Sequence, residues 1–201
     1  MPAALPPAKP RSSLSVVLTA AQAAWRLRHS NEPLPDLFVL AVRGYYRDTM
    51  GKPGVNDYGM YDDAFFVGED GRFSAWNGNT DPSRTGWNAG AGRYMARLAP
   101  GVWTFRRLKH HASRPDGYMA YGQGSSPVTV ERIRENGSIA MTETGCFGIN
   151  LHRGGRDGTS SEGCCTVPAE QWTSFDLNLL RALTDAGTMT FPFIIINGPI
   201  A

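Results

Sequence analysis

The chain has 201 residues, enough for one domain with a substantial hydrophobic core and little more. Hydrophobic residues make up 41% of it, which excludes wholesale disorder, and a net charge of +2 lacks the basic excess of a dedicated nucleic-acid binder. No apolar run approaches the roughly 18 residues that a membrane span needs. Three cysteines, two of them adjacent, are an odd number, so no disulfide framework is expected and at least one thiol is free.

The N-terminal segment divides into a tail and an apolar stretch. Residues 1–11 contain four prolines, which predicts a flexible tail. From Leu14 to Trp25, apolar residues recur at helical spacing, and Ser13 suits the N-cap of an amphipathic helix. A signal peptide is the alternative, because a basic start and a short apolar run precede the cleavage-like triplet Ala21-Gln22-Ala23.

A second helix is predicted from Leu37 to Met50, because Pro35 precedes this apolar segment and Gly51 follows it. We therefore predict that residues 12–50 form a helical segment packed on the core. Residues 51–201 would form the principal domain.

The rest of the chain predicts mostly strands, since short apolar or alternating runs are separated by turn residues. Asn136-Gly137 is a hairpin turn signal, residues 77–92 are typical of a loop, and Glu170 to Ala186 predicts a helix. The expected class is therefore α+β and β-rich. The predicted strands are Ala64–Val67, Phe73–Trp76, Tyr94–Leu98, Val102–Leu108, Val128–Arg134, Phe147–Leu151 and Phe191–Ile196.

One stretch carries the chemistry. A strand delivers His152, a glycine-rich charged loop follows, and Gly163 and Cys164 come next. A free cysteine is only a few per cent thiolate at neutral pH, so it needs a base, and histidine titrates in the right range. Arg153 and Arg156 would add positive potential and clamp a carboxylate. The backbone N–H groups of Gly163 and Cys164 could stabilise an oxyanion.

Other residues invite weaker hypotheses. His110 and His111, with Asp62, Asp63 or Cys164, could form a zinc site, although no H-E-x-x-H or C-x-x-C is present. We expect no metal and no cofactor. Cys146 and Cys165 are expected to pack in the core. The polar residues expected to bind substrate are Asn150, Ser161, Arg156, His110 and Asn79.

These motifs resemble a known family. Phe147-Gly148-Ile149, then His152, then Ser161-Glu162-Gly163-Cys164, is similar to the signature of L,D-transpeptidase (YkuD-like) catalytic domains. The resemblance implies a YkuD-like β-sandwich with N-terminal helices and one helix after the nucleophile. It also implies that Cys164 attacks an amide carbonyl of a peptidoglycan stem peptide, that His152 acts as base, and that the backbone carbonyl of Arg153 orients the imidazole.

A phage and prophage branch of peptidoglycan-degrading enzymes is more similar still, which implies an endolysin-like role. Its blocks resemble Ile149–Gly155, Thr159–Cys164 and Pro168–Trp172, with earlier blocks at Tyr61–Ala64 and Asn79–Pro82. Only eight residues separate His152 from Ser161, a shorter loop than in the transpeptidases, which favours hydrolysis over cross-linking.

The sequence therefore predicts a cysteine-dependent peptidoglycan hydrolase, an L,D-carboxypeptidase or endopeptidase. A transpeptidase, a zinc metallopeptidase and a non-catalytic wall-binding module are the alternatives. We expect a monomer that binds a peptidoglycan peptide, without nucleic acid or stable membrane insertion. It would act in the periplasm or cell wall, reached by a signal peptide, by lysis or by a separate export route.

Overall fold

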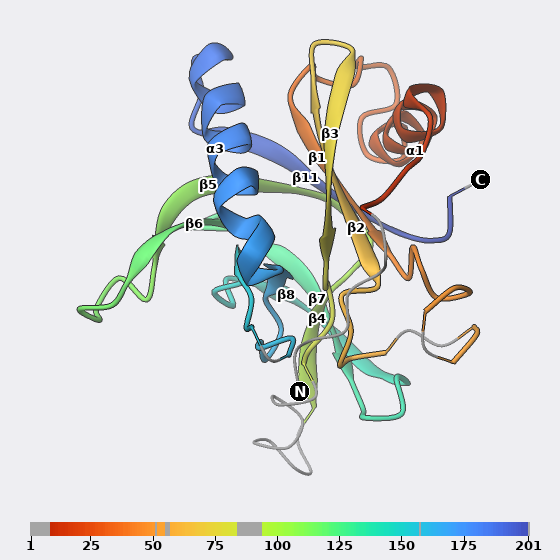
Figure 1. The fold of residues 1–201 in the computed structure, drawn as a ribbon, viewed down its shortest axis with the longest axis vertical. Coiled ribbons are helices and arrows are strands. Elements are labelled where there is room, and N and C mark those ends of the chain that lie inside the picture. The colour runs from red at the N-terminus through yellow and green to blue at the C-terminus, as the bar shows by residue number, and fades with distance from the viewer. Residues whose placement is uncertain (1–8, 51, 55–56, 84–93, 157, 201) are drawn as a thin grey trace.

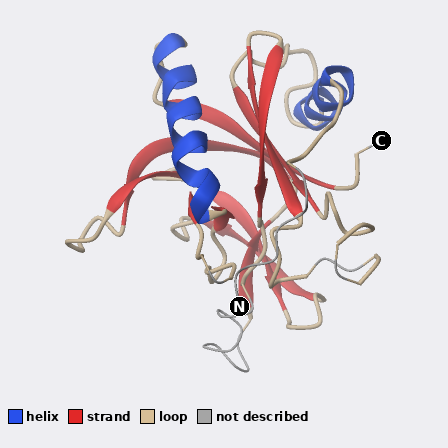
Figure 2. Cartoon of the chain, viewed as in Figure 1, coloured by secondary structure: helices blue, strands red, loops and turns tan. Residues whose placement is uncertain are grey.

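The computed structural model describes residues 9–200, except 51, 55–56, 84–93 and 157. It is 39% strand and 17% helix, which confirms the α+β, strand-rich class. Its two described helices are α1 (Leu14–Arg26) and α3 (Ala169–Asp185), and they lie on opposite sides of the sheet strands in Figures 1 and 2. Most of the predicted tail and of the predicted 77–92 loop lies outside the described residues.

In the described part of the chain, eight strands form the main sheet and three form a smaller antiparallel sheet. The small sheet has the order β4 (Met95–Leu98), β7 (Val128–Ile133), β8 (Ile139–Gly145). The main sheet has the order β10 (Cys165–Val167), β9 (Asn150–Arg153), β6 (Tyr118–Gly122), β5 (Gly101–His110), β11 (Thr190–Asn197), β1 (Phe38–Arg43), β2 (Asp63–Glu69), β3 (Arg72–Gly78).

The main sheet is nearly closed. Asn79, just beyond β3, and Thr166 in β10 exchange two backbone hydrogen bonds of 2.8 Å, so the two outermost strands of the sheet meet. Closing a sheet in this way pairs edges that would otherwise be exposed. The pairs β1–β11 and β9–β10 are parallel and the other pairs are antiparallel. Closure brings the short strand β10, directly after Cys164, against both β9 and the end of β3.

The predicted helix from Leu37 to Met50 is wrong. Phe38–Arg43 is instead strand β1, paired with β2 on one side and β11 on the other. Every residue of β1 is buried, because the main core covers one face and α1 covers the other. A strand buried on both faces is a continuous apolar run without alternation, and such a run cannot be told from a helix by periodicity. Only one N-terminal helix is therefore present among the described residues.

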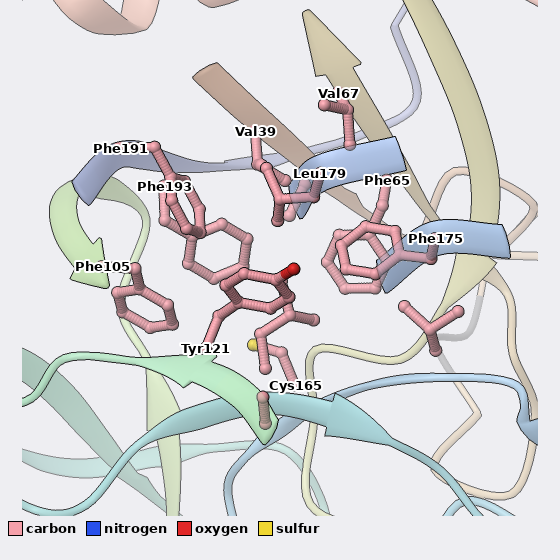
Figure 3. Packing of buried hydrophobic residues seen from close by; sticks show 14 of the residues in the cluster. Val39, Phe65, Val67, Phe105, Tyr121, Cys165, Phe175, Leu179, Phe191 and Phe193 are labelled. Carbon is pink, nitrogen blue, oxygen red and sulfur yellow. The ribbon is translucent and has the colours of Figure 1, made fainter. Parts of the chain in front are cut away.

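The core is aromatic and lies between the main sheet and α3. Figure 3 shows Phe65, Phe105, Phe193 and Tyr121 gathered in one cluster with Phe175 of the helix. The rings of Phe105 and Phe193 are 4.5 Å apart. A second apolar cluster lies under α1, where Val17, Ala21 and Trp25 contact the opposite face of β1, β2 and β11.

The remaining predictions are largely confirmed. Six predicted strands correspond to β2, β3, β4, β5, β7 and β11, and the predicted C-terminal helix to α3. The seventh, Phe147–Leu151, was placed too early, because β9 spans Asn150–Arg153 and includes His152. Asn136-Gly137 joins β7 to β8, and the Ser13 hydroxyl accepts from the Val16 N–H as an N-cap. Strands β6, β8 and β10 were not predicted; β6, for example, reads Tyr-Met-Ala-Tyr-Gly and has no alternation of polar and apolar residues. Over the described ranges, neither helix is long and apolar enough to cross a bilayer.

Candidate active site

The candidate site is built on the parallel pair β9–β10. Cys165 pairs with Leu151 and Thr166 with His152. Cys165 and Leu151 are both fully buried in the core, and side chains alternate along a strand. His152, one residue after Leu151, therefore belongs to the opposite face of β9, and Cys164 directly precedes β10. The parallel pair thus places the strand that carries the imidazole beside the strand that follows the thiol.

The His152 ring has a fixed tautomer. Its Nδ1 lies 2.8 Å from the backbone carbonyl oxygen of Arg153, and a carbonyl can only accept. We therefore assign the proton of the neutral ring to Nδ1, which leaves the lone pair on Nε2. The Tyr118 hydroxyl lies 3.3 Å from the same Nδ1 and donates to the same carbonyl. Burial, and then the neighbouring His110, lower the pKa of His152 to about 4, so the ring is neutral at physiological pH.

The Cys164 thiol is half-buried and held by backbone. The Asn150 N–H donates to Sγ at 3.4 Å, and the thiol donates to the Gly148 carbonyl at 3.8 Å. Burial raises the pKa of Cys164 to about 11, the Asn150 N–H opposes this shift, and the charge of Glu162 adds to it. The resting thiol is therefore protonated, and a nucleophile is formed only if a base takes its proton.

The turn before the thiol depends on Gly163 and Ser161. Gly163 has φ +152°, and a Cβ there would lie 2.6 Å from the Ala96 carbonyl oxygen of β4. The Ser161 hydroxyl donates to the Cys164 carbonyl at 2.6 Å and accepts from the Gly163 N–H at 3.3 Å. Ser161 is 7% exposed. Its side chain thus stabilises the turn, and the Gly163 N–H would have to leave Ser161 before it could bind an oxyanion.

His110, at the end of β5, lies beside His152. Its ring stacks on that of His152 with centroids 4.2 Å apart and an angle of 14°. The Asn150 side chain lies 3.0 Å from His110 Nδ1. Asn150 therefore contacts the thiol through its backbone and His110 through its amide. The sequence predicted both residues as substrate contacts, and the structure brings Asn150 to the thiol and His110 to the imidazole.

The other predicted residues are distributed differently. The Arg153 side chain is exposed, and its guanidinium lies 5.1 Å from the Tyr118 ring centroid. Arg156 is exposed in the loop after β9. Asn79 is buried, and its side chain accepts from the Asp81 N–H and donates to the Met60 carbonyl. Asn79 therefore joins β3 to β10 and supports the strand that follows the thiol.

Sequence reasoning missed Tyr118. It is the first residue of β6, and its hydroxyl holds the same carbonyl that fixes the His152 tautomer. Burial raises the pKa of Tyr118, so it remains a neutral hydroxyl. A lone tyrosine 34 positions before the histidine carries no local pattern, and only the pairing of β6 with β9 brings it there.

The zinc hypothesis finds no geometric support. Among the described residues, no three histidine, cysteine, aspartate or glutamate side chains are grouped so as to hold a metal ion. Asp63 instead accepts from the Gly44 and Thr80 N–H groups.

The two remaining cysteines differ from each other. Cys165 lies in the core as predicted, close to Tyr121 (Figure 3). The prediction for Cys146 is wrong, because this thiol is exposed after β8.

The chain was compared with family models, with curated proteins and with solved structures, and none of them matched.

Proposed function

We propose that the protein is a cysteine-dependent hydrolase of peptidoglycan stem peptides, with Cys164 as nucleophile and His152 as general base. The observation that carries the proposal is the paired placement on β9 and β10. There β9 carries a neutral imidazole whose Nδ1 proton is bound to the Arg153 carbonyl, and Asn150 of the same strand donates its N–H to the half-buried Cys164 thiol. The substrate class rests on the resemblance to the L,D-transpeptidase (YkuD-like) domains, and a YkuD-like fold is part of the same proposal.

The chemistry begins from a neutral pair, because the pKa of the thiol is raised and that of the imidazole is lowered. As Sγ attacks the amide carbonyl carbon, the thiol proton passes to His152 Nε2. The imidazolium then gives that proton to the leaving amine, the C–N bond breaks and a thioester remains. Water attacks the thioester, His152 takes a proton from the water, and the carboxylic acid product leaves as the thiol is restored.

One hydrogen bond of the His152 ring is retained throughout this sequence. The imidazolium keeps its Nδ1 hydrogen bond to the Arg153 carbonyl, with the Tyr118 hydroxyl beside it. The exposed Arg153 guanidinium would attract the carboxylate at the end of a stem peptide.

An amine in place of water would convert the same thioester into a cross-link, so transpeptidation is the second candidate. The short loop between His152 and Ser161 favours water.

The test is mass spectrometry of disaccharide-tetrapeptide and of cross-linked muropeptides after incubation with the wild type. We expect loss of a terminal residue or splitting of the cross-link. Cys164→Ala should reduce this activity at least about a thousandfold, because it removes the nucleophile. Cys146→Ala is the matched control, since it removes an exposed thiol outside the site, and it should remain fully active.

Three other outcomes would change the conclusion. A heavier, newly cross-linked product would assign transpeptidation. Full activity of Cys164→Ala would reject Cys164 as the nucleophile. Binding to sacculi without turnover, retained in Cys164→Ala, would identify a wall-binding module instead.

A further inference from the structure

His110 contacts the proposed base, His152, directly. His110 is the last residue of β5 and is 8% exposed. Its ring stacks nearly parallel on the His152 ring, with the ring centroids 4.2 Å apart. We propose that His110 is a positioning residue: its ring, held by Asn150, covers one face of the His152 ring and shields that base from water. This inference rests on the proposed function for its consequence, but not for its test.

The hydrogen bonds fix the orientation of the stack. An amide NH₂ can only donate, so the 3.0 Å contact from Asn150 Nδ2 assigns a lone pair to His110 Nδ1 and the proton to Nε2. Protonating His110 would put two N–H groups face to face at this contact. Asn150 also donates its backbone N–H to Cys164 Sγ. One residue therefore sets both the tautomer of His110 and the position of the thiol.

The groups around His152 make its protonated form costly. His110, which belongs to β5, covers one face of the His152 ring. The ring centroids of His110 and His111 are 3.9 Å apart. Arg153 contributes a positive charge from β9, and Tyr118 a neutral hydroxyl from β6. Cys164 precedes β10 with its thiol protonated. Among the described residues, no carboxylate is hydrogen-bonded or ion-paired to the His152 ring, whose Nδ1–H donates to the neutral Arg153 carbonyl. Burial lowers the pKa of His110 itself to about 4, so the covering ring stays neutral.

The covering ring has a functional consequence. An exposed histidine with a pKa of about 6.5 would lose its basicity below neutral pH. A His152 ring kept out of water by a second neutral ring retains Nε2 as a base at pH 5. The enzyme would then work in acidic surroundings, where an ordinary cysteine–histidine pair loses its base.

The experiment is an NMR titration of the four histidines in the full chain, using long-range ¹H–¹⁵N spectra that report both tautomer and protonation. Signals are assigned from single His→Gln variants. The wild type is compared with His110→Ala, which uncovers the His152 ring, and with His110→Phe, which keeps an aromatic ring on it. Circular dichroism and the melting temperature establish that each variant is folded.

We expect wild-type His152 to carry its proton on Nδ1 and to titrate below pH 5. In His110→Ala the midpoint should rise by more than about one pH unit toward 6.5, and in His110→Phe it should remain near the wild-type value. The ratio of kcat/KM at pH 5.5 to kcat/KM at pH 8 should be severalfold lower in His110→Ala than in the wild type. An unchanged midpoint in folded His110→Ala, or an equal rise in both variants, would overturn the proposal. The NMR result stands whether or not any muropeptide is cleaved, so failure of the proposed function remains distinguishable.

Discussion

Gly163 determines the position of the Cys164 backbone. Its φ of +152° lies outside the range that residues with a Cβ readily adopt, and the Ala96 carbonyl leaves no room for a side chain. The sequence singled out Gly163 for its backbone N–H group. The structure adds the close approach of β4, which no local pattern in the sequence contains.

Gly163→Ala should therefore destabilise the protein and displace the thiol. We expect a loss of about 1–3 kcal/mol in the free energy of unfolding, measured in urea, from backbone strain alone. We also expect at least a tenfold loss of activity. Gly158→Ala is the matched control, because no described heavy atom lies within 4 Å of a Cβ there and its φ is not left-handed. Equal stability of the two variants would show that the Ala96 contact is not tight.

At the scale of elements, β1 is the strand that joins the two apolar clusters. Val39 and Ala41 belong to the main core, while Phe38, Leu40 and Val42 face α1. The strand is thus sealed on both faces, and its parallel partner β11 comes from the far end of the chain. Shortening any of the buried apolar side chains of β1 should therefore weaken the packing of the whole sheet.

Leu40→Ala should cost about 2–5 kcal/mol of unfolding free energy, because the side chain is fully buried and its removal leaves a cavity. Leu177→Ala is the control of identical chemistry. Leu177 lies on α3 and is 62% exposed, so its loss should change stability by less than about 0.5 kcal/mol. Urea unfolding of both variants gives the comparison, and a tolerant Leu40→Ala would contradict a doubly covered β1.

At the scale of the whole molecule, a buried charged network joins the two sheets. Asp81 contacts Arg43 of β1 at 3.5 Å and Arg97 of β4 at 3.4 Å. Asp63 accepts from the Thr80 N–H and hydroxyl. Asp62 is also buried, and its Oδ1 has no hydrogen-bond partner among the described residues. The site rests on this network, since Thr80 and Asp81 directly follow the residue that pairs with β10.

This network makes stability depend on pH. Burial, and then the charge of Asp63, raise the pKa of Asp62 above its ordinary 3.8, so the folded protein holds a proton that the unfolded chain releases. The contribution of Asp62 to stability is therefore full below pH 3.8 and declines as pH rises through the raised pKa. Asp62→Asn keeps the shape of the side chain and removes this titration.

We expect the melting temperature of Asp62→Asn to fall less than that of the wild type between pH 5 and pH 8, and to exceed the wild type at pH 8. Asp116→Asn, the same change at a side chain that is 68% exposed, should follow the wild-type curve. Parallel curves for the wild type and Asp62→Asn would mean that Asp62 is ionised throughout.

The sequence was informative wherever the determining interactions are local. Alternation and turn residues predicted most strands, the N-cap at Ser13 and the helix after the thiol. His152 and Cys164 were recognisable as candidates because only eleven residues separate them in the chain. The prediction for β1 failed because burial on both faces removes the periodicity on which such predictions depend.

Taken alone, the sequence determined the strand-rich α+β class and the hypothesis of a thiol and its base, because both follow from residue types and short spacings. The tertiary structure alone decided which groups surround that base. His110, Tyr118 and Asn79 come from β5, β6 and the end of β3, and they reach His152 or β10 only because the sheet pairs these strands and nearly closes. The reason is physical: strand pairing joins residues far apart in the chain, and no local pattern encodes the partner.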